Sequence, residues 1–416
     1  MSNPKFKLSV VTVACVSVFT GCFVDSSDDD SDNGIKAQYY VAVGNSLTAG
    51  YQSGGLREDW QKSSYPALIA EKMGVADFQL PLIATPGIGR TKIGGKNTVP
   101  YYLDATGSIT TRILDASVTS LLVNSRLDRP YNNLGIPGMT TKDFIYAYDS
   151  ATSQSGNNGF FNIVMRGGLL NNTSPMRQAI RLKPTVLTMW VGNNDILGGI
   201  TEGTIREVPD ASPTVTPTAL YASLMDKALD TLLNETTARI FLANLPAITT
   251  IPFVTTVPTY VFLPETFQPA VSADVKFQTV EANVEYILVT ALPLILGKHG
   301  VPAALGGLGD SLPANVTLTK TEADAAARLT NEYNAYLKSK ADASPRIDLV
   351  DVNALLGKLQ KGELAPLTGA YPLLDPTNSA YSLDGIHPNS KGYKHITNLF
   401  IDAINSGMGK SYSRVD

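Results

Sequence analysis

Short segments rich in β-branched and aromatic residues alternate along this chain with longer segments of helical spacing. The short segments predict buried strands over residues 38–43, 185–191, 239–245 and 346–352. The helical spacing predicts helices over residues 65–73, 176–182, 220–233, 321–341 and 389–404. Because strands and helices alternate, we expect an α/β fold with a central parallel sheet covered by helices on both faces.

Two stretches of the chain lack these regular patterns. Residues 80–128 contain many glycines and threonines, and they predict loops with minor elements. From residue 246 to about residue 319 prolines recur, and apolar runs stand without clear helix caps. We therefore expect a single domain over residues 37–416 with an insertion at about 246–319.

The first residues have the pattern of an export signal. Lys5 and Lys7 precede an apolar run of 12 residues from Leu8 to Phe19, which is too short to span a bilayer. Thr20-Gly21-Cys22 follows, which is typical of a bacterial lipoprotein signal. We expect residues 1–21 to be the signal peptide and Cys22 to carry lipid. The alternative is an ordinary secretory signal with an incidental cysteine.

Residues 22–36 predict a flexible acidic tether. Ser26 to Asn33 is polar, rich in aspartate and has nothing to bury. Its charge repels an anionic membrane surface, so we expect attachment through lipid on Cys22, which anchors a protein without a transmembrane helix.

Composition excludes several classes of partner. The formal charge is −4, and the sequence has no basic patch and no phosphate-binding loop, so nucleic acid and nucleotides are not expected partners. The two cysteines are Cys15, in the signal, and Cys22, so the mature fold has no disulfide bond. With three histidines and no zinc-ligand cluster, we expect no metal site.

Polar residues follow two of the predicted strands directly. Gly44-Asn45-Ser46-Leu47 follows the first strand, and Gly192-Asn193-Asn194-Asp195 follows the strand over residues 185–191. Because ligands bind at the carboxyl ends of parallel strands, Ser46 and Asn194 should lie at the same edge of the sheet. Ser46 is a candidate nucleophile, and its ordinary structural role would be that of a helix N-cap.

Asp384 and His387 are candidates for the acid and base that activate a serine. They are three residues apart and precede the last predicted helix. This spacing on a tight turn lets a carboxylate bind one imidazole nitrogen while the other faces the serine. A capping aspartate beside an exposed histidine is the structural alternative. His299 and His395 have no acid three residues before them, and we interpret both as structural.

Three groups are candidates for stabilising an oxyanion. The backbone N–H of Ser46 lies at a predicted helix start, and Gly138 allows a close approach of backbone to substrate. The amide of Asn194 donates a hydrogen bond without adding charge. A turn glycine and a capping asparagine are the structural alternatives.

Together these segments resemble the four blocks of the GDSL/SGNH hydrolase family. The blocks read Gly44-Asn45-Ser46-Leu47, Asn133-Leu134-Gly135-Ile136-Pro137-Gly138, Gly192-Asn193-Asn194-Asp195 and Asp384-Gly385-Ile386-His387. The resemblance spans residues 38–405 and implies a flavodoxin-like three-layer α/β/α fold and serine-ester hydrolysis. By position, Ser46 is the nucleophile, His387 the base, Asp384 its partner, and Gly138 and Asn194 oxyanion donors with Ser46.

Two details depart from the simple pattern. The aspartate of the family's first block is Asn45 here, so loop anchoring should differ while the chemistry survives. The segment Gly309-Asp310-Ser311-Leu312 matches the family signature literally, but no predicted strand precedes it and Pro313 follows. We interpret Ser311 as structural.

The expected function is that of a serine esterase or lipase without a cofactor, acting on a lipid or acylated-carbohydrate ester. An acetylesterase acting on acetylated polysaccharide is one alternative, and a non-catalytic lipoprotein that binds glycans or lipids is another. The insertion could form a lid or acyl-binding wall, or could merely extend the core. Phe23 after Cys22 lacks the aspartate that retains many lipoproteins at the inner membrane, so we expect the outer membrane of a bacterial envelope.

Overall fold

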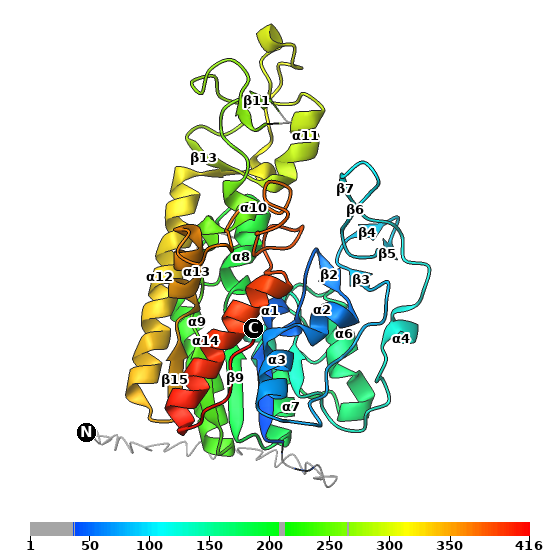
Figure 1. Cartoon of the computed structure of the whole chain (residues 1–416), viewed down its shortest axis with the longest axis vertical. Coiled ribbons are helices and arrows are strands. Elements are labelled where there is room, and N and C mark those ends of the chain that lie inside the picture. Colours follow the sequence, from blue (N-terminus) through cyan, green and yellow to red (C-terminus); the bar gives the residue numbers. More distant parts are fainter. Residues whose placement is uncertain (1–35, 37, 208–212, 264–265) are drawn as a thin grey trace, which may run out of the picture. The chain divides into compact units, whose positions relative to one another are not determined.

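The computed structural model describes residue 36 and residues 38–207, 213–263 and 266–416. At its centre lies a five-stranded sheet in which every neighbouring pair is parallel (Figure 1). The strand order is β15-β10-β9-β1-β8. Its strands are β1 (Tyr40–Gly44), β8 (Asn133–Gly135), β9 (Val186–Trp190), β10 (Arg239–Ala243) and β15 (Ile347–Val350). Numbered by occurrence, this is the 2-1-3-4-5 order of flavodoxin-like folds, and it confirms the predicted α/β class.

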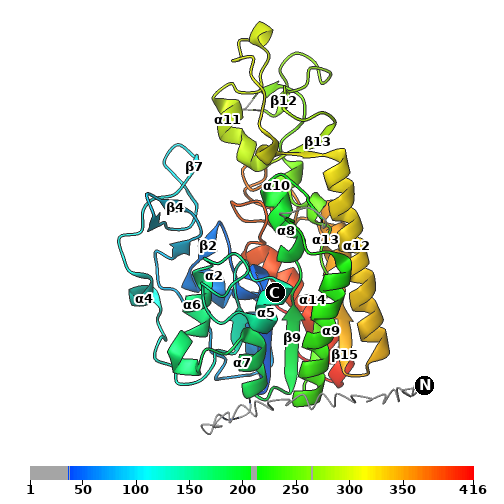
Figure 2. The same ribbon diagram turned by 180° about the vertical axis from the view of Figure 1, so that it is seen from behind.

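Helices cover both faces of the sheet, so the predicted three layers are present. Tyr40 and Ala42 of β1 pack into one hydrophobic cluster, with residues of α3 (Tyr65–Lys72) and α14 (Ser390–Met408). Val41 and Val43 point to the opposite face and pack with α5, α7, α9 and α12. Figure 1 shows α3 and α14 in front of the sheet, and Figure 2 shows α5, α7 and α9 on the other side. The alternation of side chains along β1 produces this division.

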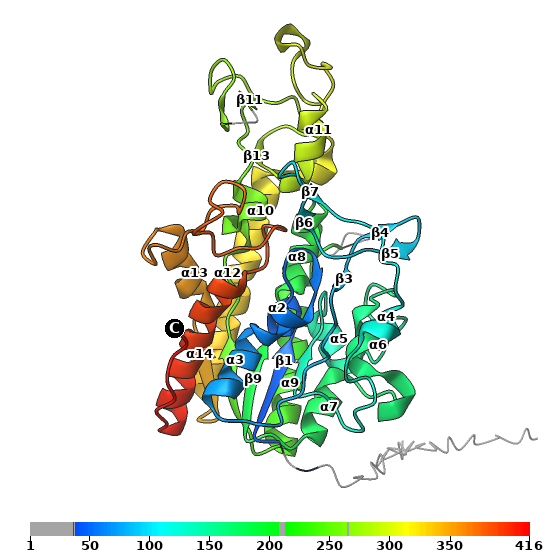
Figure 3. The ribbon, with the colours of Figure 1, turned by 45° about the vertical axis from the view of Figure 1, so that its right-hand side comes forward.

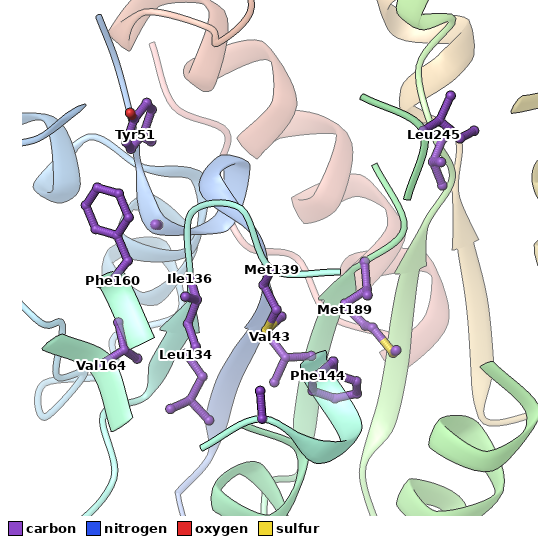
Figure 4. Close-up of a cluster of buried hydrophobic side chains, with 14 of the residues drawn as sticks. Val43, Tyr51, Leu134, Ile136, Met139, Phe144, Phe160, Val164, Met189 and Leu245 are labelled. Atoms are coloured by element: carbon purple, nitrogen blue, oxygen red, sulfur yellow. The ribbon is translucent and has the colours of Figure 1, made fainter. Parts of the chain in front are cut away.

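The second of these clusters is the larger one (Figure 4). Val43, Leu134 and Met189 come from three neighbouring strands and meet Phe144 of α5 there. All four side chains are fully buried. This packing fixes the carboxyl ends of β1, β8 and β9 relative to one another, and the candidate site residues follow these strands.

The helices of the first face are α3 (Tyr65–Lys72) and α14 (Ser390–Met408). Those of the second face are α5 (Thr141–Tyr146), α7 (Pro175–Arg181), α9 (Thr218–Glu235) and α12 (Lys320–Ala343). The other α-helices of the described residues are α1 (Ser46–Ala49), α2 (Glu58–Lys62), α4 (Val118–Leu121), α6 (Phe160–Met165), α8 (Asn194–Thr201), α10 (Pro252–Thr255), α11 (Leu292–Leu296) and α13 (Val352–Gln360). The short strands pair outside the main sheet: β2 (Gly55–Leu56), β3 (Ile88–Gly89), β4 (Lys92–Ile93), β5 (Lys96–Asn97), β6 (Tyr102–Leu103), β7 (Ile109–Thr110), β11 (Phe262–Leu263), β12 (Gln268–Pro269), β13 (Val284–Ile287) and β14 (Thr317–Thr319).

The segment between β10 and α12, where the sequence predicts an insertion, divides into two parts. Its first residues, including Ile248, Ile251 and Phe253, belong to the main core. The second part, from Val257 to Val316, contains a hydrophobic cluster of its own, although Leu288 within it packs into the main core. Figure 3 shows this second part beyond α10, at the end of the molecule that carries the carboxyl ends of the strands.

The predicted signal peptide, Cys22 and nearly all of the predicted tether lie outside the described residues. None of the helices in the part of the chain that the structure describes is long and apolar enough to cross a membrane.

Candidate active site

Ser46 lies at the first turn after β1, as its position in the sequence predicts. Asn45 is the N-cap of α1, and its side-chain oxygen accepts the N–H of Leu47 at 3.0 Å. Gly44 is required for close packing, because a Cβ there would lie 2.0 Å from Thr48 Oγ1 and 2.7 Å from the carbonyl oxygen of Trp190. The turn therefore holds Ser46 directly beside the end of β9.

The structure brings Ser46, His387 and Asp384 together in one hydrogen-bonded chain. Ser46 Oγ lies 2.8 Å from His387 Nε2, and His387 Nδ1 lies 2.9 Å from Asp384 Oδ2. Ser46 and His387 are buried, with 6% and 7% of their surfaces exposed. Both distances are those of real hydrogen bonds, so the hydroxyl, the imidazole and the carboxylate form a continuous chain, an arrangement that can activate a serine hydroxyl.

Asp384 is held as a charged acceptor by its surroundings. Its Oδ1 accepts the backbone N–H groups of Ile386 and His387, both at 2.9 Å, and the hydroxyl of Ser382 at 3.2 Å. Its Oδ2 also accepts the N–H of Gly54 at 2.8 Å. Burial raises the pKa of Asp384, but the adjacent His387 and these hydrogen bonds outweigh burial and lower the pKa below its ordinary value.

A second loop, which sequence reasoning did not identify, supports Asp384 and His387. The N–H of Ser53 donates to Ser382 Oγ at 2.8 Å, and Ser53 Oγ accepts the N–H of Leu383 at 3.3 Å. The ring of Tyr51 packs against the imidazole of His387, with 4.7 Å between ring centres. The loop after α1 therefore fixes both the orientation of His387 and the position of the Asp384 turn.

Gly138 lies on the loop after β8, which is tied to the nucleophile turn. The N–H of Ile136 donates to the carbonyl of Gly44 at 2.9 Å. Gly138 has a φ of +79°, a conformation that favours glycine, and a Cβ there would lie 3.1 Å from Asn158 Nδ2. Asn158 donates in turn to the carbonyl of Pro137 at 2.8 Å. The loop conformation therefore requires glycine at this position.

Asn194 begins α8, four positions after the last residue of β9, and lines the same cleft as Ser46 and His387. Its side-chain amide donates to the carbonyl of Met139 at 2.9 Å, which connects it to the loop that carries Gly138. One N–H of an Asn amide suffices for that bond, so the second is a candidate donor to a substrate oxygen.

Asp195 also connects the start of α8 to the loop that carries Gly138, a role that sequence reasoning did not assign. Its Oδ2 accepts both the N–H and the hydroxyl of Thr141, each at 2.9 Å. Thr141 is the first residue of α5, three positions after Gly138. Burial raises the pKa of Asp195 to about 6, although hydrogen bonds from Thr141 oppose the shift.

Asn45, which stands where the family has an aspartate, anchors its turn through two hydrogen bonds. Besides capping α1, its amide nitrogen donates to Asn193 Oδ1 at 2.9 Å. The first and third sequence blocks are therefore joined by a side-chain hydrogen bond that a carboxylate could not donate.

The other candidates considered from sequence lie elsewhere. Ser311 is exposed on the insertion, beside Leu312 of the separate hydrophobic cluster, and does not line the cleft. His299 is exposed and pairs with Asp310 at 2.6 Å. His395 lies on α14. Over residues 36, 38–207, 213–263 and 266–416, no cluster of three histidine, cysteine or acidic side chains is placed to hold a metal ion.

Comparison with known proteins gives a family match over most of the chain. The sequence model of the GDSL-like lipase/acylhydrolase family matches residues 40–400. No curated protein sequence matches the chain.

The solved structures to which the chain is similar are distant in sequence. A family 3 carbohydrate esterase of Clostridium thermocellum is 13% identical, with 89% of this chain and 96% of that chain covered and a TM-score of 0.33. An acetylxylan esterase of Geobacillus stearothermophilus is 12% identical, with 92% and 98% covered and a TM-score of 0.36. An acetyl xylan esterase of Butyrivibrio proteoclasticus is 10% identical, with 90% and 65% covered and a TM-score of 0.34.

Proposed function

The chain belongs to the GDSL-like lipase/acylhydrolase family of ester hydrolases, and we propose that it cleaves carboxylic esters through an acyl-enzyme on Ser46. The single observation that carries this proposal is the hydrogen-bonded chain from Ser46 through His387 to Asp384. A general acid–base catalyst without a nucleophile, or a binding site alone, would not need these three groups in this order.

The geometry supports a two-step reaction. His387 Nε2 takes the proton of Ser46 Oγ as the oxygen attacks the ester carbonyl, and then gives that proton to the leaving alcohol. Water, deprotonated by the same nitrogen, attacks the acyl-enzyme; the bond from the acyl carbon to Ser46 Oγ breaks, Nε2 returns the proton to that oxygen, and the acid is released. Asp384 keeps the proton of the neutral imidazole on Nδ1, which leaves Nε2 free to accept, and stabilises the imidazolium that forms.

The oxyanion that forms in each step needs donors that are already in place. We assign this role to the N–H groups of Ser46 and Gly138 and to the amide of Asn194. Hydrogen bonds from Asn158 to Pro137, from Asn194 to Met139 and from Thr141 to Asp195 hold the two loops that carry the latter donors. Each such donor typically contributes about 2.7–4 kcal/mol to transition-state stabilisation.

Steady-state hydrolysis of p-nitrophenyl esters tests this assignment, with wild type compared to Ser46→Ala and Ser311→Ala. We expect Ser46→Ala to lose at least about 10⁴-fold in kcat, because its general base then has no nucleophile to activate. Ser311→Ala is the matched control, since it removes the serine of the literal signature and should retain wild-type kinetics. Full activity in Ser46→Ala would contradict the proposed mechanism.

We also propose that the protein is held in the bacterial envelope, at the outer membrane, by lipid on Cys22. This rests on the sequence pattern of residues 1–24. Incorporation of labelled palmitate into the wild-type protein, and its loss in Cys22→Ser, is the expected result. Equal labelling of both proteins would contradict the anchor.

A further inference from the structure

Residues 88–112 form a hairpin arm that is attached to the loop supporting Asp384. The arm consists of β3, which pairs with β2, and of the two short hairpins β4–β5 and β6–β7. At its base, the N–H of Arg90 donates to the carbonyl of Gly54 at 2.9 Å. The N–H of Gly54 donates in turn to Asp384 Oδ2 at 2.8 Å. The arm therefore begins directly beside the candidate active site, at the end of the molecule that carries the carboxyl ends of the strands (Figure 1).

The hairpin arm is basic, although the whole chain has a formal charge of −4. Its charged residues are one acid and four cations: Asp104, Arg90, Lys92, Lys96 and Arg112. The four cations are exposed, and none of them forms an ion pair with a residue that the structure describes. The acid already accepts hydrogen bonds from the hydroxyl of Thr106 at 2.6 Å and from the N–H of Ser108 at 3.0 Å. A group of unpaired cations on one arm attracts anionic partners.

Large apolar side chains are exposed on the same two hairpins. Ile93 is 41% exposed, Tyr102 39% and Leu103 46%. Ile93 lies opposite Lys96 in the β4–β5 pair, so these two side chains share one face of the hairpin. An aliphatic side chain beside a cation suits the interface of a bilayer, where the cation stays at the headgroups and the aliphatic group enters the apolar layer below.

This combination favours an anionic bilayer over an acidic polysaccharide as the partner. A polysaccharide offers carboxylates to the cations, but its hydroxyl groups give Ile93 and Leu103 no apolar layer to enter. A bilayer that contains anionic phospholipids offers both. The insertion lies at the same end of the molecule (Figure 3), but its described residues after Val257 carry two lysines against four acids. The arm, and not the insertion, therefore has the charge that an anionic surface attracts.

We propose that the hairpin arm binds the surface of an anionic phospholipid bilayer, with its four cations at the headgroups and Ile93 and Leu103 in the apolar layer below them. Because the arm is attached beside Asp384, this contact holds the active-site edge of the sheet toward the bilayer. The inference goes beyond the proposed function, since the contact needs neither a reactive serine nor lipid on the N-terminal cysteine.

Sedimentation with vesicles of phosphatidylcholine, with and without phosphatidylglycerol, tests this surface. The chain from Ile35 to Asp416 is one compact unit that contains all three hydrophobic clusters, so it is used without the residues before it. We expect binding to the anionic vesicles, little binding to the neutral ones, and loss of most binding at about 1 M salt, where charges are screened beyond about 3 Å. Each lysine at such a surface contributes about fivefold to the affinity, so Lys92→Gln combined with Lys96→Gln should lower it about 30-fold.

The matched control for charge is Lys338→Gln combined with Lys410→Gln. These exposed lysines lie at the ends of α12 and α14 that are farthest from the arm (Figure 1), and this variant should bind like wild type.

A second variant tests the apolar part of the contact. Ile93→Ser combined with Leu103→Ser should lower the affinity for anionic vesicles about tenfold, because the exposed surface of these side chains can no longer enter the apolar layer. Leu169→Ser is its control, since Leu169 is 67% exposed and lies outside the arm. Thermal unfolding of every variant checks that it is folded.

The outcomes separate this inference from the proposed function. Absence of vesicle binding, equal affinity for neutral and anionic vesicles, or wild-type affinity in the lysine variant would overturn the inference. Tighter binding to soluble polygalacturonate than to anionic vesicles, with no loss in the serine variant, would assign the arm to an acidic polysaccharide and also overturn it. Ser46→Ala should bind vesicles like wild type, so the result does not depend on whether Ser46 is the nucleophile.

Discussion

Replacing Asp384 by asparagine perturbs the site with almost no change in shape. The carboxylate accepts hydrogen bonds from five donors: the N–H groups of Gly54, Ile386 and His387, the hydroxyl of Ser382, and the His387 ring. An asparagine has one oxygen, so its NH₂ group must face some of these donors whichever way it lies.

The structure indicates which orientation of the asparagine amide is favoured. With the amide oxygen in place of Oδ1, the bonds from Ile386, His387 and Ser382 survive, and the NH₂ group faces His387 Nδ1 and Gly54. The imidazole must then accept on Nδ1 and carry its proton on Nε2, where it can no longer take the proton of Ser46. The loss of the correct tautomer costs about 10⁴-fold in kcat, which is about 5.5 kcal/mol. The unpaired N–H of Gly54 costs a further 1–3 kcal/mol, roughly, of folding stability.

Two assays check this prediction. The kcat of Asp384→Asn on p-nitrophenyl butyrate should fall by about 10⁴ with KM little changed, and urea unfolding should show the stability loss. Asp310→Asn is the matched control, because it removes the acid of the exposed His299 pair and should leave kcat unaltered. An Asp384→Asn protein with more than a tenth of wild-type kcat would refute the role of this carboxylate.

The remaining predictions concern the donors and the acid behind them. Asn194→Ala should lower kcat about 10²–10³-fold with little change in KM, since it removes an oxyanion donor; an unchanged kcat in stopped assays at saturating ester would contradict this. Gly138→Ala should lower kcat and also stability, because alanine is strained at φ +79° and meets Asn158; thermal unfolding and kinetics together check it, and wild-type values in both would be the contrary result. Asp195 has a pKa of about 6 in the folded state against 3.8 for the ordinary carboxyl, so this carboxyl stays protonated to a higher pH in the folded state than in the unfolded state. The folding stability of wild type therefore falls as pH rises from about 4 to about 6. Asp195→Asn should lack this decline, a relative difference of about 3 kcal/mol, and parallel stability–pH curves for the two proteins would argue against it.

Most of the sheet could be predicted from sequence because its strands have strong local patterns. The strands expected over residues 185–191 and 239–245 correspond to β9 (Val186–Trp190) and β10 (Arg239–Ala243). The helix expected over residues 321–341 is α12 (Lys320–Ala343), which begins at a capping box of Thr319 and Glu322. Local signals of this kind need no knowledge of the tertiary structure.

Among the elements that sequence reasoning missed are two helices that begin within a few residues of the end of a strand. Helix α13 (Val352–Gln360) overlaps the end of the segment read as a strand, because Arg346 to Val352 has a continuous apolar alternation. Helix α8 contains Gly198 and Gly199, which weaken its helical pattern. Contacts with neighbouring elements decide whether such segments are helical, and the sequence pattern of a single segment does not contain information on those contacts.

The candidate site likewise contains residues that could be predicted from the sequence and residues that could not. Ser46, Asp384 and His387 could be proposed because a known order of blocks relates them, and the structure brings them into contact. Gly54 and Ser53 support Asp384 and its turn from 330 positions away in the chain. Nothing in the local sequence around Gly54 or Tyr51 indicates such contacts, since they arise only when the chain ends meet at the sheet edge.

The most direct test of the central claim is covalent labelling of the folded protein with a fluorophosphonate, followed by peptide mass spectrometry. The account predicts one adduct, on the peptide that contains Ser46, in wild type and in Ser311→Ala, and none in His387→Ala, where the serine lacks its base. Labelling at another serine, or no labelling of folded wild type, would contradict the account of Ser46 as the nucleophile.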